Sequence, residues 1–211
     1  MVAIDGPAAS GKGSLAHRLG DALGLPVLDT GLLYRAVADV VMRQGGDLSD
    51  EAACVVAARA VDIQALDPAR LRTGAMGEAA SRVAAHPPVR EALIKAQRDF
   101  AAQAPGAVLD GRDIGTVIVP EAQAKLYVTA SAEARATRRW LERQAAGETV
   151  DFETILADIR RRDARDSGRA VAPLAAAADA VLLDTTDLSI DAAFDAARRI
   201  VEAARARVKA D

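Results

Sequence analysis

The stretch Gly6-Pro7-Ala8-Ala9-Ser10-Gly11-Lys12-Gly13-Ser14 decides the fold of this chain. It follows an apolar run, residues 1–5, that predicts a strand, and it opens the helical pattern of residues 12–23, which ends at Gly24. A glycine-rich turn between a strand and a helix points successive backbone N–H groups at phosphate oxygens, while Lys12 reaches the β- and γ-phosphates. We therefore interpret this stretch as a P-loop that binds a nucleoside triphosphate.

One position departs from the common form of this loop. The residue after Lys12 is Gly13 rather than Ser or Thr, so the hydroxyl that would lie near a Mg²⁺ ion moves to Ser14. The extra glycine is typical of nucleoside monophosphate kinases rather than of GTPases. We expect Ser14 and Asp110 to lie at the metal position, with Asp110 orienting a metal-bound water.

Four further short apolar runs predict strands, and helical patterns lie between them. The alternation indicates the α/β class with a doubly wound, five-stranded parallel sheet. The predicted strands cover residues 1–5, 26–29, 107–109, 125–128 and 180–183. The predicted helices cover residues 12–23, 31–43, 51–60, 77–85, 89–104, 131–145, 151–167 and 189–208, with Ser131 and Ser189 as N-caps.

We expect one P-loop domain over residues 1–211, with two segments that form walls of a cleft. Residues 35–105 hold helical patterns and no convincing strand, so we interpret them as a helical insertion. Residues 151–172 hold Arg160, Arg161, Arg162, Arg165 and Arg169. A solvated helix end would usually mix lysine with glutamate, so with a P-loop in the same chain we favour a mobile, phosphate-clamping lid.

Composition excludes several other classes of function. The chain has 211 residues, of which 51% are hydrophobic and 27% charged, as expected for a globular protein rather than a disordered one. A net charge of −3 argues against nucleic acid as the main partner, and no apolar stretch reaches the ~20 residues of a membrane helix. One cysteine and two distant histidines argue against zinc or iron–sulfur chemistry. We expect a cytoplasmic protein with no targeting segment.

Two other segments carry polar residues to the ends of predicted strands. In Asp29-Thr30-Gly31-Leu32-Leu33-Tyr34-Arg35, the side chains of Thr30, Tyr34 and Arg35 should face the crevice that the P-loop borders. The segment Asp110-Gly111-Arg112-Asp113 ends the next strand and should enter the same crevice. Arginine holds phosphate in a planar, bidentate manner, so Arg35 could hold a second phosphate.

Taken together, these motifs resemble the bacterial type of cytidylate kinase over nearly the whole chain. The ordered set adds three segments to the P-loop, the Asp29–Arg35 segment and the Asp110–Asp113 segment. They are Ala80-Ser81-Arg82-Val83-Ala84 with Arg90, Arg162-Asp163-Ala164-Arg165-Asp166 with Arg169, and Ala172-Pro173-Leu174. The resemblance implies transfer of the γ-phosphoryl group of ATP to cytidine or deoxycytidine monophosphate, with Mg²⁺ as cofactor and the chain acting as a monomer.

The resemblance also implies a role for each residue of the motifs. The catalytic set is Lys12, Arg112, Arg162 and Arg169. ATP is held by Gly6 to Ser14, with Arg138 and Arg139 near the donor. The acceptor phosphate is held by Thr30, Tyr34, Arg35, Arg112 and Arg169, the cytosine by Ser81, Arg90 and Asp113, and the sugar side by Arg162 and Asp166.

One departure and two rival functions bear on this interpretation. Members often carry a small antiparallel sheet in the insertion, and residues 62–73 are too short to contain all of it. A kinase for another acceptor, such as adenylate or shikimate, would differ in the wall that Ser81, Arg90 and Asp113 form. A GTPase switch would need an Asn-Lys-x-Asp motif and a hydroxyl directly after Lys12, and the chain has neither.

Overall fold

A computed structural model describes residues 1–208 and has a parallel sheet at its centre. Its strands are β1 (Val2–Asp5), β2 (Val27–Asp29), β3 (Val108–Gly111), β4 (Ala124–Thr129) and β5 (Val181–Asp184), in the spatial order β2-β3-β1-β4-β5. All neighbours pair in parallel, with Val2 opposite Val108 on one side and Ala124 on the other. The predicted α/β class and five-stranded parallel sheet are confirmed.

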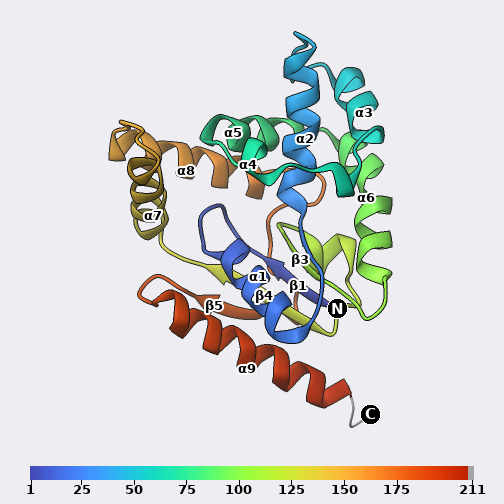
Figure 1. The fold of residues 1–211 in the computed structure, drawn as a ribbon, viewed down its shortest axis with the longest axis vertical. Coiled ribbons are helices and arrows are strands. Elements are labelled where there is room, and N and C mark those ends of the chain that lie inside the picture. Colours follow the sequence, from blue (N-terminus) through green and yellow to red (C-terminus); the bar gives the residue numbers. More distant parts are fainter. Residues whose placement is uncertain (209–211) are drawn as a thin grey trace.

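Helices cover both faces of this sheet (Figure 1). The helices around the sheet are α1 (Lys12–Leu23), α2 (Thr30–Arg43), α6 (Pro87–Ala102) and α9 (Ile190–Val208). Leu19 of α1 and Val201 of α9 pack with Ile4, whereas Val37 of α2 and Leu93 of α6 share the other core cluster with Leu109. Within β1, Ala3 belongs to one of these clusters and its neighbour Ile4 to the other, because alternate residues of a strand point to opposite faces. Helices cover both faces, so every residue of β1 is buried.

The remaining elements extend beyond the carboxyl ends of the strands. They are α3 (Glu51–Arg59), the 3₁₀ turn η1 (Ile63–Ala65), α4 (Pro68–Leu71), α5 (Gly74–Val83), α7 (Ala132–Ala145) and α8 (Phe152–Ser167). Helices α7 and α8 pack on one another around Ile155 and Trp140, and α8 also contacts α5. Figure 1 shows α7 and α8 on the opposite side of the molecule from α3 and α6.

Three local features differ from the sequence-based expectation. Helix α5 begins at Gly74 because Thr73 caps it, and α4 begins after the Asp67 cap. Between β3 and β4 lies a π-helical turn, η2 (Ile114–Ile118), that the sequence pattern did not predict. The carboxylate of Asp5 accepts hydrogen bonds from the first backbone N–H groups of this turn, at 2.7 Å from Ile114 and 2.8 Å from Gly115.

Candidate active site

A cavity of about 870 Å³ opens at the carboxyl ends of the strands. The P-loop residues Ala8 to Ser14 line one side, and residues from α2, α5, α6, α7, α8, α9 and the end of β3 line other parts. The other predicted site residues that line it are Thr30, Tyr34, Arg35, Ser81, Arg90, Asp110, Arg112, Asp113, Arg138, Arg139, Arg162, Asp166 and Arg169. Gly6 and Pro7 do not line this cavity. Residues of both predicted phosphate sites therefore line the same cavity.

The P-loop takes its shape from close packing against the sheet. Gly6 has a φ of 148°, and a Cβ there would lie 1.9 Å from the carbonyl oxygen of Val128, so only glycine fits. Gly11 has a φ of 90° and forms the N-terminal boundary of α1. These glycines let the strand turn sharply into the helix whose N-terminus faces the cavity.

Lys12, the first residue of α1, is buried at the edge of the cavity. Its residue is 5% exposed, and its Nζ donates to the carbonyl of Pro7 at 2.9 Å and lies 3.8 Å from the carboxylate of Asp110. Burial, with the nearby Arg112 guanidinium, lowers the pKa of Lys12 to about 8. A lysine held this way has lost most of its water and can gain strongly from a phosphate partner.

Beside α2 and α6, the cavity contains a buried ion pair under an aromatic ring. Arg90 of α6 donates to the carboxylate of Asp113, and both side chains are less than one-tenth exposed. The Arg90 guanidinium lies 5.4 Å from the centre of the Tyr34 ring. Beside them, Thr30 donates to the backbone carbonyl of Asp110 at 2.8 Å, which joins α2 to β3.

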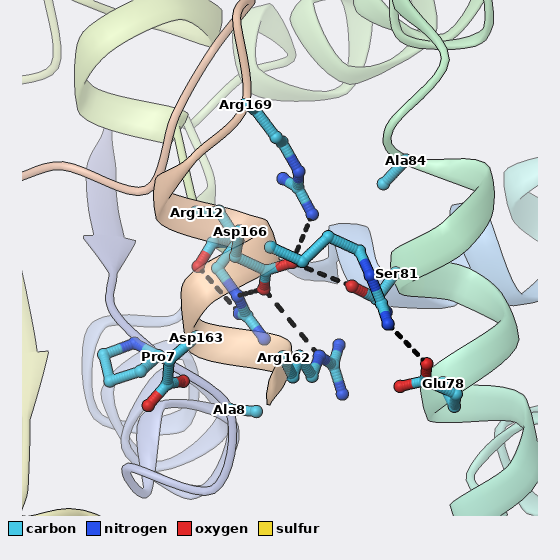
Figure 2. A network of polar contacts seen from close by, with 12 residues as sticks. Pro7, Ala8, Glu78, Ser81, Ala84, Arg112, Arg162, Asp163, Asp166 and Arg169 are labelled. Carbon is cyan, nitrogen blue, oxygen red and sulfur yellow. Dashed lines mark hydrogen bonds and ion pairs between the residues drawn. The ribbon is translucent and has the colours of Figure 1, made fainter. Parts of the chain in front are cut away.

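Asp166 is the centre of a network of polar contacts (Figure 2). Its carboxylate accepts from Ser81 at 2.9 Å, from Arg169 at 2.5 Å and from Arg112 at 3.1 Å, and the Nε of Arg162 lies 3.7 Å away. Burial acts to raise the pKa of Asp166, but the three guanidiniums hold it below its usual range. This carboxylate therefore stays ionised and gathers residues of α5, α8 and the β3–η2 segment.

Three guanidiniums from different helices converge beside α5. A Cβ placed on Gly77 would lie within 4 Å of guanidinium nitrogens of Arg162, Arg139 and Arg35. Burial and the neighbouring Arg112 lower the pKa of Arg162 to about 9. The buried Nε atoms of Arg35, Arg162 and Arg169 have no hydrogen-bond partner among residues 1–208. Arg162 and Arg169 also pair with Asp166, but the free Nε donors can still bind an anionic ligand.

The five arginines of the predicted lid do not share one orientation. Arg162 and Arg169 line the cavity, but Arg160 and Arg161 are more than half exposed and pair with Glu133 and Asp158. Arg165 pairs with Glu78 of α5 at 2.6 Å. Arg160, Arg161 and Arg165 do not line the cavity, because a helix turns neighbouring residues to different faces, and the mobile, phosphate-clamping lid stays a prediction.

Beside the P-loop, α7 contacts the loop after β5. Arg138 donates from Nη1 to the hydroxyl of Thr185 at 3.1 Å and from Nη2 to its carbonyl at 2.5 Å. Thr185 in turn donates to the P-loop carbonyl of Ser10 at 3.1 Å. Arg139 lies 3.5 Å from Glu142 and reaches toward Gly77.

Sequence reasoning missed several residues of this site. Asp29, Arg72, Glu78 and Thr185 line the cavity, and Arg72 lies 3.2 Å from Asp29. Asp29 had a signal, since it stands at the end of β2. Arg72 and Glu78 belong to the insertion, whose path over the sheet no local pattern indicates.

The fold and the cavity define a P-loop kinase of the α/β class, with an arginine-rich wall across the cavity from the P-loop. Comparison with known proteins agrees. Residues 2–204 match the family model described as cytidylate kinase, and the chain belongs to the cytidylate kinase family.

Curated relatives cover almost the whole chain. It is 65% identical over 206 residues to the cytidylate kinase of Xanthobacter autotrophicus, covering 98% of this chain and 99% of that protein. It is 61% identical over 207 residues to that of Caulobacter vibrioides, covering 98% and 97%. A solved structure of an uncharacterized protein from Eubacterium ventriosum matches with a TM-score of 0.54 and 15% identity over 96% of this chain and 97% of that one, and it supports the fold alone.

Proposed function

We propose that this chain transfers the γ-phosphoryl group of ATP to cytidine or deoxycytidine monophosphate, giving ADP and the diphosphate. The observation that carries the proposal is the cavity of about 870 Å³ that joins a P-loop to buried arginines whose Nε atoms make no hydrogen bond among residues 1–208. Membership of the cytidylate kinase family supports the choice of acceptor. The enzyme is also proposed to act as a monomer, in the cytoplasm.

On the donor side, the triphosphate is proposed to lie along the P-loop, Gly6 to Ser14. The backbone N–H groups of the loop and the N-terminus of α1 would face its oxygens, and Lys12 would exchange its contact with Pro7 for phosphate. Arg138 and Arg139 approach the same end from α7 and would contact the donor nucleotide.

On the acceptor side, the monophosphate is proposed to lie between α2 and α8. Thr30, Tyr34, Arg35, Arg112 and Arg169 would surround its phosphate. The buried pair Arg90 and Asp113, with Ser81, would present donors and acceptors to the edge of the base. Arg162 and Asp166 would lie toward the sugar.

Phosphoryl transfer by these residues depends on alignment and positive charge. The phosphate oxygen of the acceptor is already ionised near neutral pH, so no general base is required. Lys12, Arg112, Arg162 and Arg169 would stabilise the charge on the transferred group. Seating of α8 over the cavity would exclude water that could otherwise hydrolyse ATP.

The donor set beside the P-loop fits a Mg²⁺ ion. Asp110 is 7% exposed, and its Oδ2 is 3.5 Å from where a Cβ on Gly13 would lie, so the carboxylate faces the start of α1. Ser14 lines the same wall. Mg²⁺ commonly takes one or two protein oxygens and completes its shell with water and phosphate. When bound, it would neutralise phosphate charge, with Ser14 and Asp110 holding it directly or through water.

A coupled assay of ADP production tests the proposal. The purified protein is given ATP and Mg²⁺ with a panel of cytidine, deoxycytidine, uridine and adenosine monophosphates. Turnover should be highest with the cytidine compounds. Equal turnover with adenosine monophosphate, or ATP hydrolysis that no monophosphate increases, would contradict the proposed acceptor.

A further inference from the structure

Arg135 of α7 is a buried arginine that connects the P-loop to helix α8. Arg135 is 5% exposed. The Nε donates to the carbonyl of Ala130 at 2.9 Å, and Nη1 donates to the carbonyl of Ala8 at 3.2 Å. Nη1 and Nη2 also donate to the two carboxylate oxygens of Asp163, at 3.1 and 2.6 Å. One guanidinium thus links the residue that follows β4, the P-loop and α8.

The contact with Ala8 orients the peptide group that follows it. In a trans peptide the C=O and the next N–H point in opposite directions. Ala8 and Ala9 line the cavity and Arg135 does not, so Arg135 holds the Ala8 carbonyl from behind the loop. The N–H of Ala9 is thereby directed away from Arg135, to the side where phosphate oxygens are expected.

Ala9 needs such a restraint because its backbone is strained. Its φ is 59°, in the left-handed region that residues with a Cβ rarely adopt. A conformation of this kind persists only where surrounding contacts impose it. Lys12 holds the carbonyl of Pro7 and Arg135 holds that of Ala8, so two cations fix the two peptides before Ala9.

Asp163 makes this restraint depend on the position of α8. It pairs with Arg135 through both oxygens and stands next to Arg162 and three residues before Asp166, which line the cavity. In Figure 2 Asp163 lies beside Pro7 and Ala8. If α8 moves away, the bidentate pair is lost, and Arg135 loses the partner that aims it at the loop.

We propose that Arg135 and Asp163 are positioning residues that keep the Ala8–Ala9 peptide in its phosphate-binding orientation while α8 is seated. The inference goes beyond the proposed transfer reaction and rests only on the part of it in which the P-loop binds ATP. Its consequence is that the seating of α8 strengthens ATP binding even before a monophosphate is present.

The chain offers a matched control for this pair. Glu133 of α7 and Arg160 of α8 form an ion pair of 2.7 Å between the same two helices. Both side chains are well exposed, at 59% and 60%, and neither contacts the P-loop. Glu133→Gln therefore removes a link between α7 and α8 without touching the Ala8 carbonyl.

The test measures ATP affinity without a monophosphate, by titration calorimetry, and then KM for each substrate. Arg135→Gln and Asp163→Asn should each raise the Kd and KM for ATP about tenfold, because a preorganised N–H donor is no longer held in place. KM for cytidine monophosphate should stay within about twofold, and Glu133→Gln should leave both constants within about twofold. The double variant should lose little more affinity for ATP than either single variant does.

Asp163→Asn keeps Arg135 and decides the test if Arg135→Gln does not fold, which thermal unfolding shows. The inference is overturned if Asp163→Asn binds ATP as tightly as Glu133→Gln does, or if both substrates lose affinity equally. If the unmodified protein binds ATP but phosphorylates no cytidine compound, the proposed function fails and this inference is still decided by the ATP titration.

Discussion

The P-loop and the arginine network around Asp166 face one cavity but are built in different ways. The P-loop, Gly6 to Ser14, is continuous in sequence and presents mostly backbone groups. The network brings together Ser81, Arg112, Arg162 and Arg169, which are separated by up to 88 positions along the chain. The first depends on local geometry, and the second depends on how α5, α8 and β3 pack.

Two buried aspartates differ in a similar way, because backbone groups surround one and charged side chains surround the other. Burial raises the pKa of Asp5 to about 6, although the backbone N–H groups of Gly115 and Ile114 oppose the shift. At Asp166 the guanidiniums outweigh burial and lower the pKa. Backbone dipoles hold a buried carboxylate in place, but full positive charges are needed to keep it strongly ionised.

The largest expected effect is on the P-loop side, from Lys12→Met. A preorganised cation next to the transferred group is worth about 3 kcal/mol or more of transition-state stabilisation. We expect kcat to fall by at least about 100-fold in a folded protein. The control is Lys95→Met, because Lys95 is exposed and its ion pair with Asp99 lies on the surface of α6. Near-normal kcat in folded Lys12→Met would remove the P-loop from the mechanism.

The next effect tests the network. Asp166→Asn leaves Arg112, Arg162 and Arg169 without their shared carboxylate, so the free energy of unfolding should fall by about 3 kcal/mol. KM for cytidine monophosphate should rise more than KM for ATP, because the network borders the acceptor side. Urea unfolding and steady-state kinetics measure both. Asp158→Asn, on the same helix and half exposed, should cost under about 0.5 kcal/mol. Equal losses in the two variants would show that Asp166 is not the organising charge.

The difference between the two regions also explains how much the sequence could predict. The strand, glycine-rich turn and helix of the P-loop are neighbours in the chain, so their order already implies their geometry. In α8, Arg162 and Asp166 follow the i, i+4 spacing of one helix face, which could have separated Arg162 from Arg160 and Arg161. Arg135 had no such signal, because its partner Ala8 lies 127 positions away.

Two segments of the fold show the same limit. Asp67 followed by Pro68 is a helix start that could have predicted α4, although a helix of four residues has almost no periodicity. The π-helical turn η2 contains Ile114, Gly115 and Val117, which favour no helix locally. It forms because Asp5, on a neighbouring strand, accepts its first two N–H groups.

The pH dependence of stability tests the contrast between Asp5 and Asp166. The native state keeps the Asp5 proton up to about pH 6, whereas an ordinary aspartate has a pKa of 3.8, so Asp5 makes the free energy of unfolding fall as pH rises between those values. Asp5→Asn should remove this decrease. The slope of the unfolding free energy against pH corresponds here to a difference of at most about one bound proton. Urea unfolding at three pH values across the window measures it. Parallel curves for variant and unmodified protein would contradict the assigned shift.

A smaller effect is expected from Ser81→Ala, at the edge of the network. Ser81 is 2% exposed and donates to Asp166 at 2.9 Å. Loss of one such bond should lower kcat/KM for cytidine monophosphate by about fivefold and that for uridine monophosphate by less, so the two values converge. Ser167→Ala, at an exposed position beside Asp166, serves as the control. Equal losses for both substrates would make Ser81 a structural residue only.

The smallest effect is expected from Arg161→Gln. Arg161 is the neighbour of Arg162 in sequence, but it is 56% exposed and pairs with Asp158 on its own helix at 2.5 Å. Water and salt screen such a pair, so the free energy of unfolding should change by less than about 0.5 kcal/mol and kcat by less than about twofold. Kinetics and urea unfolding beside Arg162→Gln measure the contrast. If Arg161→Gln reduced kcat as much as Arg162→Gln does, the positive charge of α8 as a whole would matter more than the network around Asp166. A full loss in Arg162→Gln alone would show that the function depends on which face of the helix carries the guanidinium.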